Sequence, residues 1–375
     1  MQFSKNNSLA LKGLAICMMM FHHLFLAQER FEGFDVNFAP FTPKQVINVA
    51  AMFKICVSLF VFVTGYGLFL SYNNLAKKGA DRREIGKWCL VRLIKTMSGF
   101  WYIYIICFVV TMLTNDMPFD KYYLGNEVVK GTMYVLFDFL GLGHLLGTPT
   151  LCGTWWYMGV AIIYILLIPF LFHIKKKTGW FSLLILVILL PRMLNQGYMG
   201  GRNALTFMPI LILGMTSADY EIFERLGAKL QNIGKLKATL FCWLVAVLGI
   251  LVSYMLWANF QREEIWGINC NLVPLVFIFL VKYCLISLKS INSFLIFMGK
   301  HSMTIFLTHA FLRVTYLNEW IYSRGHFITI YIALFATSLV LAIVLDALKN
   351  VVGVDKVVDK ICGKITQKTA DVGGN

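Results

Sequence analysis

The stretch LKGLAICMMMFHHLF, Leu11–Phe25, is apolar and, with its flanks, long enough to cross a bilayer. It nevertheless carries Lys12, His22 and His23. Ionisable groups at membrane depth are costly, so their presence there is by default a functional-site hypothesis. On an α-helix Lys12 and His23 lie about 20° apart in azimuth and ~16 Å apart along the axis, so they share one polar stripe. The alternative is that Lys12 only snorkels to the interface while His23 bonds to a neighbouring helix.

The composition is that of a polytopic α-helical membrane protein. Of 375 residues, 58% are hydrophobic and only 14% are charged, which is too apolar for a soluble globular protein. The net charge of +15 does not indicate nucleic acid, because most of the 34 lysines and arginines fill alternate short loops between apolar runs. The nine cysteines include no CxxC pair, and the seven histidines lack neighbouring carboxylates. We therefore expect neither a disulfide framework nor a metal site.

The apolar runs predict an all-α fold of about ten transmembrane helices with both termini in the cytoplasm. The first run lacks the small-residue cleavage pattern of a signal peptide, so we expect it to be retained. Residues 1–350 form the expected transmembrane domain, and 351–375 a short basic cytoplasmic tail. Pro191, Gly200 and Gly201 interrupt the pattern between the fifth and sixth spans. The expected spans are 9–27, 50–73, 90–113, 151–173, 180–197, 202–218, 238–259, 268–288, 295–316 and 326–348.

The longest expected outer segment, Thr114–Thr150, contains MYVLFDFLGLGHLLG. This run is too short and too rich in glycine for a span. A re-entrant or interfacial helix is the expected structure, since such segments occur where protein or water satisfies the backbone. Its glycines do not match the GxGxxG spacing of a phosphate-binding loop.

Four stretches, taken in order, carry a resemblance to a known family. They are Lys12 with His23, VSLFVFVTGYGLFLSY (Val57–Tyr72), RLIKTMSGFW (Arg92–Trp101) and MGKHSMTIFLTHAF (Met298–Phe311), with a weaker fifth in GTWWYMGVAIIYILLIPFL (Gly153–Leu171). Together they resemble the acyltransferase family 3 integral membrane proteins. The departures from the family pattern are Ser58 where aspartate is common, Thr64 for serine, Lys95 for arginine and Ser98 for proline.

The resemblance implies transfer of an acyl group, most often acetyl, from cytoplasmic acyl-coenzyme A to a hydroxyl of an extracytoplasmic glycan or lipid-linked sugar. It also implies a bacterial cytoplasmic membrane and O-acetylation of a cell-envelope polysaccharide. Coenzyme A is polyanionic, and Lys12, Arg92 and Lys95 lie at the expected cytoplasmic face, where cations suit its phosphates. Arg92 and Lys95 share a helix face one turn apart. The alternative for these cations is an ordinary positive-inside flank.

His23 is the expected general base, because the imidazole pKa near 6.5 suits removal of a hydroxyl proton. His309, in LTHAF, is the second catalytic candidate, with interhelical bracing as its alternative. A covalent acyl-histidine intermediate stays open. The oxyanion donor also stays open, the candidates being Arg202, Arg192, Trp155 and Trp156.

A transporter or flippase for a polyprenyl-linked or glycan substrate is the alternative function, with the buried charges as its pathway. Transporters often contain inverted repeats with broken helices in matching halves. The sequence shows one broken region, Pro191–Gly201, and no repeat. The GxSxG pattern of serine hydrolases and the HxxxxD pattern of glycerolipid acyltransferases are both absent. The sequence therefore favours an acyltransferase.

Overall fold

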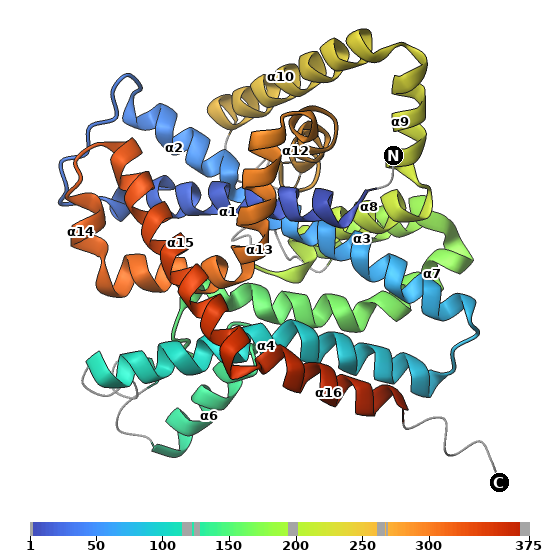
Figure 1. The fold of residues 1–375 in the computed structure, drawn as a ribbon, viewed down its shortest axis with the longest axis horizontal. Helices are drawn as coiled ribbons and strands as arrows, with labels where there is room; N and C mark the ends of the chain where they lie inside the picture. The colour runs from blue at the N-terminus through green and yellow to red at the C-terminus, as the bar shows by residue number, and fades with distance from the viewer. Residues whose placement is uncertain are drawn as a thin grey trace. The chain divides into compact units, whose positions relative to one another are not determined.

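The computed structural model describes residues 3–114, 122–123, 128–193, 202–260, 267 and 269–367, with the backbone alone at 128 and 192. Within these ranges the chain is helical apart from turns and one isolated parallel bridge between Asn37 and His326 (Figure 1). The predicted all-α class is confirmed for this part of the chain. Gly200 and Gly201, which interrupt the apolar pattern, lie outside the described residues.

The α-helices are α1 (Lys5–Phe25), α2 (Pro43–Met52), α3 (Cys56–Lys77), α4 (Arg82–Thr114), α6 (Val128–Phe139), α7 (Trp156–Met193), α8 (Ala204–Asp219), α9 (Ile222–Asn232), α10 (Lys235–Asn259), α12 (Val273–Phe279), α13 (Lys289–Phe311), α14 (Asn318–Tyr322), α15 (Phe327–Val352) and α16 (Val354–Gln367). Single 3₁₀ turns occur at η1 (Gln28–Arg30), η2 (Phe53–Ile55), η3 (Gly153–Trp155) and η5 (Leu285–Ser287). Two segments are π-helical, η4 (Leu280–Cys284) and η6 (Leu312–Tyr316).

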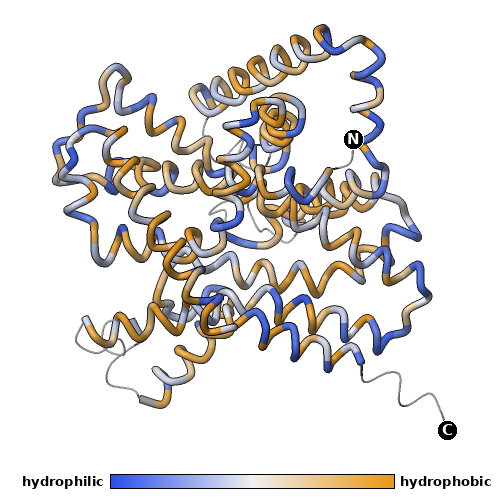
Figure 2. Tube along the Cα trace, in the orientation of Figure 1, coloured by the Kyte–Doolittle hydropathy of each residue, from blue (hydrophilic) through white to orange (hydrophobic). Residues whose placement is uncertain are grey.

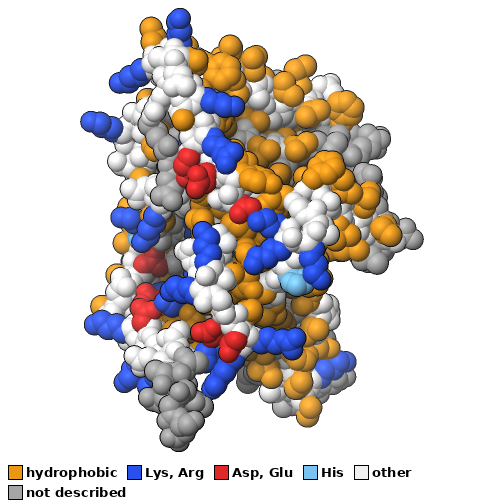
Figure 3. Space-filling view, turned by 90° about the vertical axis from the view of Figure 1, so that its right-hand side faces the viewer, with side chains coloured by type: hydrophobic (Ala, Val, Ile, Leu, Met, Phe, Trp, Pro, Cys, Tyr) orange, Lys and Arg blue, Asp and Glu red, His pale blue; other side chains and the backbone are white. Residues whose placement is uncertain are grey.

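Seven helical stretches within the described ranges are long and apolar enough to cross a membrane. They include α1, α4, α10 and α15, while α8 is shorter, with 16 residues. Figure 2 shows apolar residues along most of these helices and hydrophilic residues at many of their ends. Figure 3 shows a face on which lysine and arginine side chains are frequent, with some acidic side chains between them. The count of ten spans and the cytoplasmic termini remain expectations.

Helix α7 runs through the two spans that the sequence analysis separated, 151–173 and 180–197. It bends at Gly179, whose φ of 79° and ψ of 171° are outside the helical region. Glycine tolerates this positive φ because it has no Cβ. Instead of a loop between the expected spans 151–173 and 180–197, the chain has a bend at Gly179. Residues 194–197 lie outside the described residues.

The chain divides into two compact units, each described here by itself. The first comprises Met1–Ser71 and Phe172–Leu339, and the second Tyr72–Leu171 and Val340–Asn375.

Helices α1 and α13 of the first unit cross with their backbones in contact at two glycines (Figure 1). A Cβ built on Gly13 would lie 2.8 Å from the carbonyl carbon of Leu295. A Cβ on Gly299 would lie 2.6 Å from the carbonyl carbon of Leu9. Small residues allow this close approach, which is how helices in membranes gain van der Waals contact. Each glycine therefore faces the backbone of the opposite helix.

Helix α8 contains Pro209, whose ring removes a backbone N–H donor and disturbs the helical ladder around it. The side chain of Asn271 bridges the ladder there. Its Oδ1 accepts from the Ile210 N–H at 2.9 Å, and its Nδ2 donates to the Thr206 carbonyl at 3.0 Å. The buried amide thus satisfies two backbone groups, as apolar surroundings require.

The second unit contains a buried carboxylate at the end of α6. Asp138 Oδ2 accepts from the Tyr123 hydroxyl at 2.6 Å and from the Leu151 N–H at 2.7 Å. Tyr104 and Tyr123 hydroxyls are 2.9 Å apart, which extends the network to α4. Burial raises the pKa of the Asp138 carboxyl to about 6, although its two hydrogen bonds oppose the rise.

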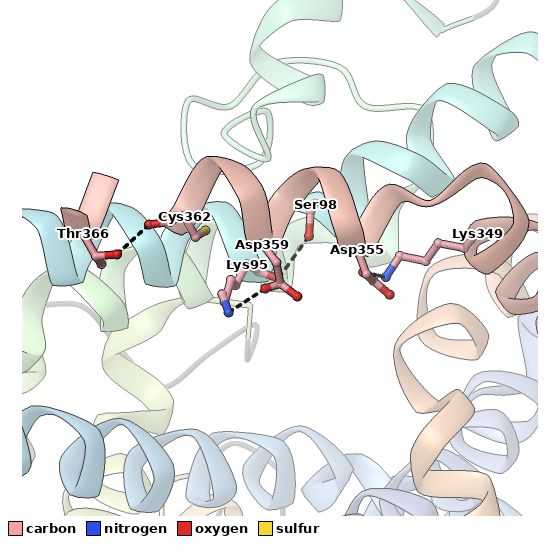
Figure 4. A network of polar contacts seen from close by, with 7 residues as sticks. All are labelled: Lys95, Ser98, Lys349, Asp355, Asp359, Cys362 and Thr366. Carbon is pink, nitrogen blue, oxygen red and sulfur yellow. Dashed lines mark hydrogen bonds and ion pairs between the residues drawn. The ribbon is translucent and has the colours of Figure 1, made fainter. Parts of the chain in front are cut away.

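Helix α16 occupies most of the expected tail 351–375 and packs along α4 within the second unit. Lys95 Nζ lies 2.9 Å from Asp359 Oδ1, and Lys349 Nζ lies 2.7 Å from Asp355 Oδ1 (Figure 4). Polar residues alternate with apolar ones in VDKVVDKICGKITQ so that one face is apolar. The tail is therefore an amphipathic helix as far as Gln367.

Candidate functional site

The two histidines selected from the sequence lie together in the first unit. His23 lies near the end of α1, and His309 lies near the end of α13. Their ring centroids are 5.0 Å apart, with 54° between the ring planes. His309 is fully buried, whereas His23 is partly exposed. The Gly13 and Gly299 contact brings the two helices close enough for these rings to meet.

The hydrogen bonds of His309 determine its tautomer. Its Nδ1 lies 2.9 Å from the Ile305 carbonyl oxygen and 3.0 Å from that of Phe306. Carbonyl oxygens only accept, so Nδ1 carries the proton, and the neutral ring has its lone pair on Nε2. That Nε2 is buried without a hydrogen-bond partner among the described residues. These bonds go to its own helix rather than to the neighbouring helix expected of a bracing residue.

His23 has the opposite tautomer. Arg30 Nη1 lies 3.3 Å from His23 Nδ1 and also donates to the His23 main-chain carbonyl. A guanidinium only donates, so His23 Nδ1 is an acceptor and the neutral ring carries its proton on Nε2. The pair therefore presents an N–H donor on His23 and a lone pair on His309.

The neighbouring His22 has a structural contact. Its Nδ1 donates to the Ala50 carbonyl oxygen at 2.7 Å, which links α1 to α2. Its ring also meets that of His23 edge to face, with centroids 5.2 Å apart. His22 therefore restrains the ring of His23 from the side of α2.

A buried arginine follows His309 by one turn. Arg313 lies in the π-helical segment η6 and is 9% exposed. Its Nη1 reaches the Tyr322 hydroxyl at 3.5 Å, and its buried Nε has no hydrogen-bond partner among the described residues. Tyr322 in turn donates to the Leu24 carbonyl at 3.0 Å, next to His23 on α1. The guanidinium thus lies beside the histidine pair.

Further cations surround the same histidines. Burial, together with the nearby charges of Arg313 and Arg202, lowers the pKa of the Arg30 guanidinium to about 10. Lys54 interacts electrostatically with His23, Arg30 and Arg202. We call Arg30, Lys54, Arg202 and Arg313 the outer cation cluster. The sequence analysis named only Arg202 among them.

Of the missed residues, Arg313 had a usable signal, because it follows His309 by four positions and so continues the same helix face. Arg30 had none, because it lies in the turn η1 after α1, where no periodicity relates it to His23.

The residues expected to bind coenzyme A fall in different units. In the first, Lys12 is partly buried within α1 and makes no hydrogen bond or ion pair with the described residues. In the second, Arg92 lies 5.8 Å from the centroid of the Trp88 ring. Lys95 is paired with Asp359, and its side chain is 48% exposed. Lys12 thus keeps its ammonium group available, while Lys95 already has a carboxylate.

Among the open oxyanion candidates, Arg202 belongs to the outer cation cluster. The side chain of Arg192 lies outside the described residues, and Trp155 and Trp156 lie in the second unit. Ser58, at the position where the resembled family often has an acid, is fully buried, and its hydroxyl has no hydrogen-bond partner within the part of the chain that the structure describes. The described ranges contain no group of three or more His, Cys, Asp or Glu side chains that would hold a metal ion.

The family model described as an acyltransferase domain, Acyl_transf_3, matches residues 9–347. This range runs from α1 into α15 and includes the histidine pair and the outer cation cluster. No curated protein and no solved structure matches the chain.

Proposed function

The chain belongs to the acyltransferase 3 family of membrane proteins, and from this we propose that it is an acyl-coenzyme A-dependent O-acyltransferase. It moves an acyl group, by default acetyl, to a hydroxyl of an extracytoplasmic glycan or lipid-linked sugar at the bacterial cytoplasmic membrane. The observation that carries the proposal is the 5.0 Å approach of the His23 and His309 rings, with a lone pair on one and an N–H on the other.

We propose different roles for the two rings, and their tautomers support this division. The sequence analysis gave the role of general base to His23, but the Arg30 bond occupies its Nδ1 and leaves a proton on Nε2. His309 Nε2 therefore takes the proton of the acceptor hydroxyl. The hydroxyl oxygen bonds to the thioester carbonyl carbon, and His23 Nε2–H donates to the developing oxyanion. The carbon–sulfur bond then breaks, and the sulfur leaves with the proton held by His309.

Lys12, Arg92 and Lys95 are proposed to bind the phosphates of the donor. The support for Lys12 is a partly buried ammonium group with no hydrogen bond or ion pair to the described residues. Holding such a charge in an apolar helix is costly without an anion. Arg92 and Lys95 are supported by their position on one face of α4. Lys95 must exchange its Asp359 carboxylate for the donor.

The test compares His23→Gln with His309→Gln in membranes supplied with acetyl-coenzyme A. A glutamine at 23 keeps an amide N–H near the position of Nε2, so transfer falls but persists, whereas His23→Ala abolishes it. His309→Gln lacks a base, so the rate falls by roughly 10²–10⁴-fold. His301→Gln, on the same helix, is the matched control and keeps its rate. Membrane abundance is measured in parallel.

Equal losses in both glutamine variants would refute the division of roles. Unchanged thioester cleavage and transfer in His23→Ala would remove His23 from the mechanism. Movement of a labelled glycan across vesicles without thioester cleavage would support the transporter instead.

A further inference from the structure

The buried guanidinium of Arg313 has no carboxylate partner among the described residues. Its Nη1 makes one long contact with Tyr322, and its Nε makes none. Removing a charge from water costs several kcal/mol unless an opposite charge and hydrogen bonds compensate. The acyl-transfer step needs one or two donors for a transient oxyanion, and in the proposed mechanism His23 Nε2–H is the donor. Arg313 is therefore available to bind an anion other than this oxyanion.

The surrounding charges point the same way. Within the described ranges Arg30, Arg202 and Arg313 form no ion pair with a carboxylate, and the acidic side chain acting on Arg30 is the exposed Glu29. In the expected topology these cations fall on the outer side, where basic residues are the minority. Their gathering beside the histidine pair is thus not an ordinary cytoplasmic flank.

We infer that the outer cation cluster binds a permanent anionic group on the acceptor, a carboxylate or phosphate carried by the sugar close to the hydroxyl that receives the acyl group. The inference rests on the proposed function and specifies its substrate class. Arginine forks match carboxylate and phosphate oxygens, and Arg313 offers its unpartnered Nε for such a bond.

The phosphates of coenzyme A are the wrong anion for this position. Arg30 Nη1 is 3.3 Å from the His23 ring, so an anion bound there lies beside the reacting thioester. The donor's phosphates are separated from its sulfur by the whole pantetheine arm. The acceptor, whose hydroxyl must reach the same rings, is the substrate that brings an anion so close.

The experiment measures equilibrium binding of glucuronate, glucose 6-phosphate and glucose to the purified full-length protein, with and without coenzyme A. We expect glucuronate or glucose 6-phosphate to bind and glucose not to bind. The anion with the higher affinity shows whether the acceptor's anionic group is a carboxylate or a phosphate. Arg313→Gln weakens anion binding by about 10- to 100-fold, and Arg313→Lys by less. Affinity for coenzyme A stays the same in both variants.

Arg324→Gln is the matched control, because it removes the same charge from an exposed side chain stacked on Trp320. It leaves anion binding unchanged. The inference would be overturned if glucose bound as tightly as the two anions. It would also be overturned if Arg313→Gln bound the anions as tightly as the wild type does, or if coenzyme A displaced them. Loss of thioester transfer to every acceptor in the wild type would instead refute the proposed function.

Discussion

Alanine at Gly299 or Gly13 is expected to separate the two histidines without unfolding the protein. A Cβ at 299 would lie 2.6 Å from the Leu9 carbonyl carbon and 3.0 Å from its Cα. Carbon atoms rest at about 3.5–4.0 Å, so α1 and α13 must move apart by about 1 Å. A misplacement of this size in a catalytic arrangement costs roughly 10²-fold in rate. Overpacking of this kind also costs about 1–3 kcal/mol of stability.

The assay is acyl transfer in membranes, normalised to protein abundance, together with the thermal unfolding midpoint in detergent. Gly67→Ala is the matched control, because Gly67 is also in an apolar helix, but beyond its own stretch of helix no described atom lies within 4 Å of a built Cβ. It keeps the wild-type rate. A Gly299→Ala protein that transfers acyl groups at the wild-type rate would show that the ring pair does not depend on the backbone contact.

The remaining predictions concern the second unit. Lys95→Ala raises the KM for acyl-coenzyme A, whereas Asp359→Ala does not. Neither substitution changes the free energy of unfolding by more than about 1 kcal/mol, because the ion pair is exposed. The same KM in Lys95→Ala as in the wild type would show that Lys95 serves only its ion pair. The Asp138 carboxyl has its pKa raised from 3.8 to about 6, so the folded state binds the extra proton. Stability is greatest below pH 4 for this group and falls by up to ~3 kcal/mol as the pH rises past 6. Thermal melts from pH 4 to 8 measure this, and Asp138→Asn flattens the dependence; an unchanged slope in that variant would refute it.

The sequence was sufficient to predict the all-α class and to select His23 and His309 as candidates, because both inferences depend on local pattern. The length of an apolar segment identifies a membrane span, and an ionisable residue within that segment is easily recognised. The approach of His23 to His309 was not predictable, since it depends on glycines from α1 and α13 meeting. A glycine in one helix does not reveal which helix it faces.

The same limit applies to the roles of the two rings. The sequence analysis expects His23 to be the base, and the proposal gives that role to His309, because a sequence alone does not distinguish one imidazole from another. The hydrogen bond from Arg30, in a turn outside the helix, decides which nitrogen holds the proton. For His309 the deciding carbonyls belong to its own preceding turn. The tautomer of each ring follows from its hydrogen bonds, and these bonds correspond to no periodic pattern in the sequence.

The π-helical segments show how the fold accommodates cations in an apolar unit. Lys282 lies in η4, is 3% exposed and donates to Asn7 Oδ1 at 3.0 Å. Arg313 lies in η6 and is buried to a similar degree. A π turn inserts an extra residue, which shifts the side chains after it around the helix, and such turns often occur at functional sites. Lys282 donates to an amide oxygen, whereas Arg313, apart from its long contact with Tyr322, keeps an Nε with no hydrogen-bond partner among the described residues. A buried N–H without an acceptor is costly, so this difference between the two cations is the reason to propose that Arg313 binds a ligand.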